Sequence, residues 1–532
     1  MVRRHGMATS RVENASRNVV FGMLLKGYQV LMPFLMRTVM LYYMGTEYLG
    51  LNSLFGSILW ILNLAELGVG SAMVYSMYQP IIDEDTEQIC ALLKLYRTYY
   101  RVIGLVIAVV GTAISPLVPS LIKKDSYDVG IALEIILPGS VGNGIPDDIN
   151  IYVVYWLNLL CTVLSYWLFA YKNSLIMAHQ RNDVISKVTL ATNTFQYFAQ
   201  FAVIIFLGDY YVYLITAIVT QVITNIVTAI CASKMYPDYK PQGKMKKEHA
   251  AKINQRIKDL FTMKLGNAIV SSADSIVVSK FLGLTMVAIY NNYFYILTAV
   301  WNIGRVMLSS CTAGIGNSLL MESKEKNYID MKKFTFIMAW ICGFCSACLL
   351  CLFQPFMKLW AGEDLTLGFS AVIAFVLYFA VEQINQVFIT YKDAAGIWHE
   401  DRFRPLITAL ANLFLSILLA QWWGIYGVVL ATVISEVVIS MPWILHNIFS
   451  TMFKRSMKEY VLRLFVYAAV IAIVSALTFF ITSVIPDGNI GLLLVKGIAA
   501  AIVSNLLFFV AYFKTKEFAQ VKEIVFRILK RG

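Results

Sequence analysis

The sequence predicts an all-α integral membrane protein, with fourteen transmembrane helices arranged as two six-helix lobes plus a C-terminal helix pair. The chain of 532 residues is 59% hydrophobic and only 14% charged, whereas a soluble protein has about 25% charged residues. Apolar stretches of about 20 residues, long enough to cross a bilayer as a helix, recur along its whole length. Charged residues within these stretches, and glycines between them, recur at nearly one spacing, which indicates an internal repeat.

The apolar stretches define the expected spans in chain order. We expect one transmembrane helix in each of these ranges: 19–43, 51–78, 102–122, 149–171, 184–207, 211–233, 257–280, 286–317, 334–357, 366–390, 404–422, 425–449, 462–484 and 490–513. The polar, basic residues 1–18 precede a full-length apolar stretch, so we expect the first span to be retained and not cleaved as a signal peptide.

The basic residues indicate the orientation of the chain. With the N-terminus inside, most of the 44 Lys and Arg residues fall in loops on the cytoplasmic side. This asymmetry is the positive-inside pattern, and it predicts a multi-pass protein with both termini in the cytoplasm. The same asymmetry accounts for the net charge of +12, so we expect no nucleic-acid partner.

The repeat predicts two lobes of like orientation. The repeated pairs are Lys26 with Lys264, Gly45 with Gly283 and, one residue out of step, Glu66 with Arg305. A Tyr-Lys pair followed seven residues later by His also occurs twice, at 171–179 and at 391–399. Because each copy holds six spans, the lobes should be related by a pseudo-two-fold axis along the membrane normal.

The repeat and the loops also predict the domain boundaries. We expect an N-lobe at 1–233, a cytoplasmic linker loop at 234–256, a C-lobe at 257–450, and a helix hairpin with a basic cytoplasmic tail at 451–532. The linker is rich in Lys and contains Pro and Gly. We interpret its charge as topology signal and attraction to lipid headgroups.

Four cations within the spans point to the handling of an anion. These are Lys26, Arg37, Lys264 and Arg305. A charge at the middle of a span costs roughly 2.5–3.5 kcal/mol on insertion scales and persists mainly where it meets water, a partner or a substrate. Arg also matches phosphate oxygens with its planar fork. Alternatively, the two lysines extend to the headgroups, and Arg37 anchors the topology.

Polar side chains on the same faces are candidates for lining a cavity or balancing charge. They are Glu66, Asn291, Thr298, Glu382 and Glu436, and Asp274 is a further buried acid. Buried carboxylates either hold cations in place or bind and release H⁺ or Na⁺ during transport. Two alternatives stay open: a structural ion pair between Glu66 and Arg305, and a purely structural acceptor role for Asp274 and Glu436.

Signals for an enzyme are weak. The acidic triplet at 83–85 opens an amphipathic cytoplasmic stretch, where a solvated helix start explains it. The four cysteines at 342, 345, 348 and 351 fan around an expected helix and do not converge on a metal. We therefore expect no catalytic residue, no metal and no cofactor, although coupling to an H⁺ or Na⁺ gradient stays open.

Three segments of the chain carry a resemblance to a known family. They are residues 48–80, which contain ELGVGSA, residues 92–105 and residues 171–184. Together with the fourteen-span plan, they resemble the Wzx-type oligosaccharide flippases, or polysaccharide biosynthesis transporters, of the multidrug/oligosaccharidyl-lipid/polysaccharide (MOP) superfamily. The resemblance extends over essentially the whole chain.

The resemblance implies a function and a site. It implies that the protein moves an undecaprenyl-diphosphate-linked oligosaccharide from the inner to the outer leaflet of the bacterial plasma membrane, for surface polysaccharide biosynthesis. It places Arg37 and Arg305 in a cationic central cavity, assisted by Lys26 or Lys264, and makes Asp274 the candidate for the coupling ion. The implied partners are the lipid-linked glycan and membrane lipids, and contacts with a polysaccharide polymerase and glycosyltransferases are allowed.

Two alternatives from the residues stay open. An ion-coupled multidrug antiporter of the same superfamily would bind lipophilic cations, so its pocket should be net acidic. A membrane glycosyltransferase or polymerase belongs to a different class, and it usually needs more external surface than these loops supply.

Overall fold

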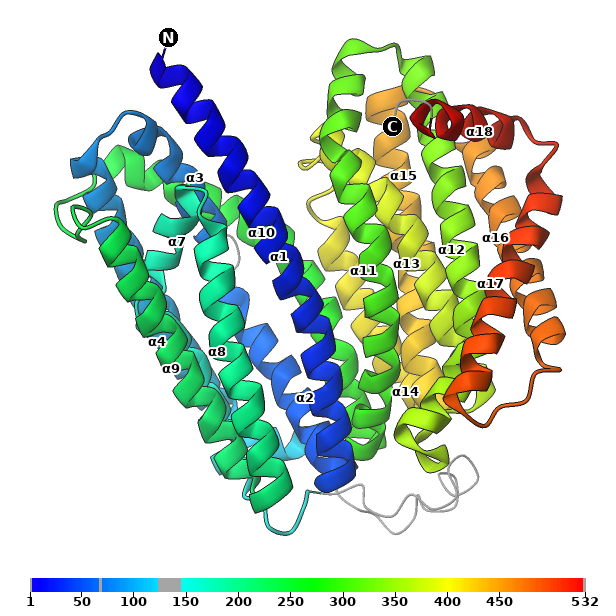
Figure 1. The fold of residues 1–532 in the computed structure, drawn as a ribbon, viewed down its shortest axis with the longest axis horizontal. Coiled ribbons are helices and arrows are strands. Elements are labelled where there is room, and N and C mark those ends of the chain that lie inside the picture. The colour runs from blue at the N-terminus through cyan, green and yellow to red at the C-terminus, as the bar shows by residue number, and fades with distance from the viewer. Residues whose placement is uncertain (1, 67–68, 123–144, 530–532) are drawn as a thin grey trace. The chain divides into compact units, whose positions relative to one another are not determined.

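The described part of the protein is almost entirely helical. The computed structural model describes residues 2–66, 69–122 and 145–529, and within them it contains helices joined by short connections and no strand (Figure 1). By their internal contacts these residues form two units, which are described separately. Unit 1 comprises the described residues up to 288, and unit 2 those from 289 onward.

Unit 1 is built from long apolar helices and their short extensions. Its elements are α1 (Val2–Tyr43), α2 (Thr46–Leu62), η1 (Asn63–Glu66), α3 (Val69–Ile82), α4 (Thr86–Ile114), η2 (Ser115–Leu121), α6 (Ile151–Trp167), α7 (Tyr171–Ala178), α8 (Asn182–Ala202), η3 (Val203–Leu207), α9 (Tyr210–Met235) and α10 (Lys247–Leu282). Helix α1 packs against α8, and α6 packs against α4 and α9. Large aromatic side chains such as Phe55, Tyr96 and Tyr155 are fully buried in its core.

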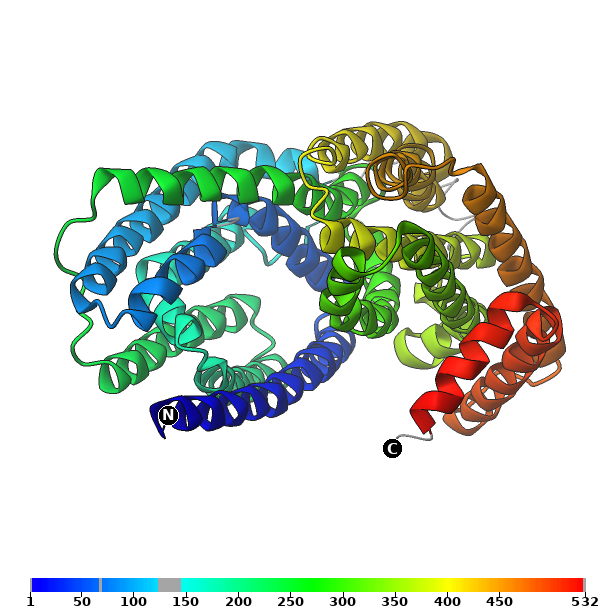
Figure 2. The same cartoon turned by 90° about the horizontal axis from the view of Figure 1, so that it is seen from above.

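Unit 2 is organised around one central helix. Its elements are α11 (Leu284–Met321, which begins in unit 1), α12 (Lys324–Ala361), η4 (Glu363–Leu365), α13 (Phe369–Ala395), α14 (Arg404–Ser435), η5 (Glu436–Ser440), α15 (Met441–Ile448), η6 (Phe449–Phe453), α16 (Lys458–Thr482), α17 (Ile490–Tyr512) and α18 (Lys516–Leu529). Helix α12 packs against α13, α16 and α17 (Figures 1 and 2). The segments η3, η5 and η6 are π-helical turns.

The helices agree with the predicted spans in position. In the described residues, each of the fourteen ranges lies mostly on helical elements, although some ranges cover several, as 51–78 covers α2, η1 and α3. The two ranges 404–422 and 425–449 flank Gly424, where α14 leaves the helical conformation. In the described residues, 8 helices are long and apolar enough to cross a membrane, or up to 9 if α6 and α7, bent by 50° at their break, form one span. The multi-pass membrane character is therefore confirmed, and the count of fourteen stays a prediction.

The contacts divide the chain later than the predicted linker. Residues 236–246 connect α9 to α10, and α10 then packs against α2 and α3 of unit 1. The division between units falls between residues 288 and 289, near the start of α11. The predicted lobe boundaries, the linker role of residues 234–256 and the symmetry axis stay predictions.

Two glycines matched by the repeat have the same backbone conformation. Gly45, between α1 and α2, has φ 105° and ψ 178°, and Gly283, between α10 and α11, has φ 93° and ψ 172°. This region of backbone space is essentially restricted to glycine. Both therefore form the same kind of junction, each between a pair of consecutive helices at matching points of the repeat.

Alanine at either junction is expected to destabilise the protein. A side chain at Gly45 or Gly283 forces the backbone into a conformation that costs about 1–3 kcal/mol. Gly56 is the matched control, because it is exposed on α2 with nothing within 4 Å of the added Cβ atom. Thermal unfolding of the purified variants measures the effect, and equal stabilities of Gly283→Ala and Gly56→Ala would contradict the expectation.

Candidate functional site

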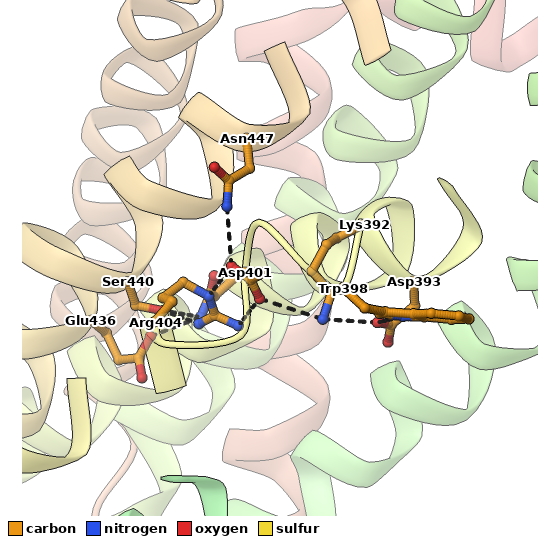
Figure 3. A network of polar contacts seen from close by, with 9 residues as sticks. Lys392, Asp393, Trp398, Asp401, Arg404, Glu436, Ser440 and Asn447 are labelled. Carbon is orange, nitrogen blue, oxygen red and sulfur yellow. Dashed lines mark hydrogen bonds and ion pairs between the residues drawn. The ribbon is translucent and has the colours of Figure 1, made fainter. Parts of the chain in front are cut away.

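A buried aspartate in unit 2 holds two cations. Asp401 lies in the loop between α13 and α14 and is 2% exposed. Arg404 donates from Nε to Oδ1 at 2.7 Å and from Nη2 to Oδ2 at 3.0 Å, which is a two-bond pairing of high geometric specificity. The Lys392 amine lies 3.5 Å from Oδ2 (Figure 3). Asp401 thereby ties the start of α14 to the end of α13.

The network continues from this loop to a buried glutamate. Arg404 donates from Nη1 to the Ser440 hydroxyl at 2.6 Å. Asn385 donates to the same hydroxyl at 3.5 Å and to Glu436 Oε2 at 2.8 Å. Glu436 and Ser440 begin and end the π-helical turn η5, and both are buried (Figure 3). A chain of polar contacts therefore connects Asp401 to Glu436 through side chains of α13, α14 and η5.

Three of the predicted site residues lie in one region of unit 2. Glu382 is on α13, one turn before Asn385, and it interacts electrostatically with Glu436, Arg305 and Arg404. Arg305 is exposed on α11, and its guanidinium lies 4.7 Å from the centre of the Trp301 ring. Two carboxyl groups thus share their surroundings with two guanidinium groups. The functional roles predicted for Arg305, Glu382 and Glu436 stay predictions.

The two polar residues predicted on α11 are less informative. Thr298 is half-buried and donates its hydroxyl to the Tyr295 carbonyl at 2.9 Å, which is a bond within its own helix. Asn291 is also half-buried, two turns before Thr298 on α11. Their predicted role in lining a cavity stays a prediction.

The predicted cations of unit 1 are spread over two helices. Lys26 is exposed and Arg37 half-buried on α1, and helix geometry separates them by about 16 Å along the axis. Arg37 acts electrostatically on Tyr213 of α9. On α10, Asp274 is buried, whereas the side chain of Lys264 lies outside the described part of the chain. The predicted roles of all four stay predictions.

Glu66 borders a polar cavity of about 670 Å³ within unit 1. The cavity is lined by Glu66, Gly70, Val74, Tyr75, Tyr78, Tyr100, Ser165, Tyr166, Ala170, Asn173, Ser174, Met177, Gln221 and Asn225. The Tyr166 hydroxyl donates to Glu66 Oε2 at 2.8 Å, so the carboxylate has a partner within its own unit. The alternative pairing with Arg305 joins residues of different units and stays a prediction.

The repeated Tyr-Lys-His segment precedes a buried aspartate in each unit. In unit 1, Asp183 is fully buried and pairs with Arg181 at 2.8 Å and with Lys187 at 3.2 Å. In unit 2, Asp401 follows His399 by two residues, whereas Asp183 follows His179 by four, and Asp401 has its own two cations. The repeated pattern includes the Tyr, Lys and His of this segment but neither aspartate. Opposite charges three or four residues apart, such as Asp401 with Arg404, are the signal that points to them.

The described residues contain no arrangement of three or more His, Cys, Asp or Glu side chains that would hold a metal ion. The four cysteines of the C-x2-C pattern lie along α12 as free thiols. Their positions fit packing within a membrane helix.

The fold of the chain is similar to the folds of solved membrane transporters. Over 93% of its length the chain is similar to 99% of the lipid II flippase MurJ in an inward closed conformation, with a TM-score of 0.64 and 15% identity. It is similar to an inward-facing multidrug resistance MATE family transporter of the MOP superfamily, with a TM-score of 0.57 and 14% identity over 80% of this chain and 96% of that one. The chain has the MOP transporter fold.

A third structure extends this finding. The chain is also similar to a mutant of the Vibrio cholerae MATE transporter VcmN, with a TM-score of 0.52 and 13% identity. The similarity extends over 84% of this chain and 100% of that one. No sequence profile of a protein family and no curated protein matches the chain. These structures are of transporters and a flippase and not of enzymes, in keeping with the expectation that the chain is not an enzyme.

Proposed function

We propose that the protein is a flippase that moves an undecaprenyl-diphosphate-linked oligosaccharide across the bacterial plasma membrane. The observation that carries the proposal is the similarity of the chain over 93% of its length to a lipid II flippase, whose substrate is by its name a lipid. The three segments that resemble Wzx-type flippases support an oligosaccharide on that lipid and a role in surface polysaccharide biosynthesis.

Alternating access gives the charged residues distinct roles. Arg37 and Arg305, helped by Lys26 or Lys264, neutralise the diphosphate, because guanidinium groups pair with phosphate oxygens and stay protonated in a cavity. The prenyl tail stays in lipid while the lobes rock and expose the glycan outside. The acids Glu382, Glu436 and Asp274 balance these cations or take up the coupling H⁺ or Na⁺.

An ion-coupled multidrug antiporter is the second candidate. The similarity to a MATE family transporter favours it, as do the two carboxyl groups that lie near one another in unit 2, Glu382 and Glu436. A pocket for lipophilic cations would use such acids directly. No observation in the described structure favours the third reading, a membrane glycosyltransferase or polymerase.

Deletion of the protein distinguishes these candidates. We expect a deletion strain to lose surface glycan and to accumulate full-length lipid-linked oligosaccharide on the cytoplasmic leaflet, because synthesis continues while translocation stops. Sensitivity to lipophilic cationic drugs should stay unchanged. Normal surface glycan with increased drug sensitivity would contradict the flippase and support the antiporter, and shortened glycan chains would indicate a polymerase.

A further inference from the structure

The cavity of unit 1 is lined by two kinds of side chain, aromatic rings and amides. Four tyrosines contribute aromatic surface, in two pairs: Tyr100 stacks on Tyr166 with ring centres 6.2 Å apart, and Tyr75 meets Tyr78 edge-on at 6.2 Å. Such rings combine a broad apolar face with a polar hydroxyl. At about 670 Å³, the cavity lies within the range of about 300–1,000 Å³ that is usual for small-molecule sites.

Amide side chains also line the cavity, and two of them are held in defined orientations. Gln221 donates to Asn225 Oδ1 at 3.1 Å, and Asn225 in turn donates to the Ser165 carbonyl at 3.2 Å. This arrangement directs the Gln221 amide by fixing its nitrogen, while its oxygen remains an acceptor. Asn173 also lines the cavity. Amides offer both donors and acceptors, which is what hydroxyl groups require.

The charge of the cavity excludes a phosphate. Among the described residues that line it there is no Lys or Arg, and the one charged side chain among them is Glu66, a carboxylate that would repel an anion. Glu66 accepts a hydrogen bond from Tyr166 and interacts with Tyr100. Glu66 therefore helps to orient the two stacked tyrosine rings. The cavity as a whole suits an uncharged, hydroxyl-rich ligand with an apolar face.

We propose that this cavity binds sugar rings of the transported glycan, apart from the cations that take its diphosphate. A pyranose ring has an apolar C–H face that packs on an aromatic ring and a rim of hydroxyls that bonds to amides and carboxylates. The inference rests on the proposed function, since it assumes that a lipid-linked glycan is the substrate. It adds that unit 1 selects for the sugar itself.

Binding of two lipids tests the proposal. The probes are lipid-linked oligosaccharide isolated from cells that lack the protein, and undecaprenyl diphosphate without sugar. We expect Gln221→Leu and Asn173→Leu each to weaken binding of the glycosylated lipid by roughly five- to tenfold, as the loss of one or two hydrogen bonds predicts. Binding of the sugar-free lipid should stay unchanged.

Gln196→Leu is the matched control, because Gln196 is a half-buried glutamine of α8 that does not line the cavity. It should bind both lipids as the wild type does, and thermal unfolding should show all variants folded. If the cavity variants keep the wild-type preference for the glycosylated lipid, the inference is wrong while the proposed function stands. If the wild type binds neither lipid, the proposed function fails.

A third probe separates sugars from organic cations. Ethidium is a planar cation that could also stack on tyrosine and pair with a carboxylate. We expect the wild type and the two cavity variants to show no difference in ethidium binding. Loss of ethidium binding in Gln221→Leu, with glycosylated-lipid binding retained, would overturn the assignment in favour of a cation pocket.

Discussion

Asp401→Asn is expected to destabilise the protein by about 3–5 kcal/mol, the usual cost of leaving a buried charge without its partner. Arg404 and Lys392 are 6% and 7% exposed, so neither can turn to water when the carboxylate is removed. Asparagine keeps the shape of the side chain and loses its charge. We expect a lower unfolding temperature in detergent and less protein in the membrane.

Asp393→Asn is the matched control for this change. Asp393 also pairs with Lys392, at 2.9 Å, but its side chain is 43% exposed, so its loss should cost at most about 1 kcal/mol. Adding Arg404→Met to Asp401→Asn should restore part of the stability, since it removes the orphaned guanidinium and leaves Lys392 paired with Asp393. Equal stabilities of Asp401→Asn and Asp393→Asn would show that the network contributes little.

Arg305→Ala is expected to reduce translocation of the lipid-linked glycan by about 10–100-fold, which corresponds to the 1.5–3 kcal/mol of a hydrogen bond to a charged group. Protein level and unfolding temperature should be unchanged. Arg305 is exposed and, among the described residues, forms no direct ion pair, and its electrostatic effect on Glu382 is shared with Arg404, which remains in the variant. Measuring flipping in proteoliposomes relative to their protein content separates a loss of translocation from a loss of folded protein.

Arg402→Ala is a close control for this prediction. Arg402 is also exposed in unit 2, and its guanidinium lies over the Phe403 ring at 4.7 Å, as that of Arg305 lies over Trp301. Its replacement should leave translocation at the wild-type rate. Arg305→Lys should recover part of the activity, because the charge returns without the planar fork. Wild-type flipping by Arg305→Ala would remove this residue from the mechanism.

The helices could be predicted from the sequence because their signal is local. Bilayer length and apolar composition identify a span without knowledge of its neighbours, and each predicted range lies mostly on helical elements of the described structure. The repeat pairs Gly45 with Gly283, and the structure adds that both have a positive φ. The break between the ranges 404–422 and 425–449 is also local, because it falls at Gly424, where the backbone leaves the helical conformation.

The partners of the charged residues could not be predicted in this way. Glu66 receives its hydrogen bond from Tyr166, which is 100 residues away on another helix. Arg404 reaches Ser440, 36 residues later, because α14 reverses its direction between them at a kink. Periodicity places a side chain on a face of its helix but does not say which helix covers that face. The sequence therefore identified Glu382 and Glu436 as polar and missed Asp401.

The π-helical turn η5 holds one extra residue within a candidate transmembrane segment. A π-helical turn contains an extra residue relative to an α-helical one, and such turns are often found at functional positions. If η5 tightened, the residues beyond it would rotate by about 100° and advance by about 1.5 Å. Ser440, the last residue of η5, would then move away from the Arg404 guanidinium, while Glu436, its first residue, stayed beside Asn385. The segment would thus change its register after Glu436 at the cost of the hydrogen bond between Arg404 and Ser440.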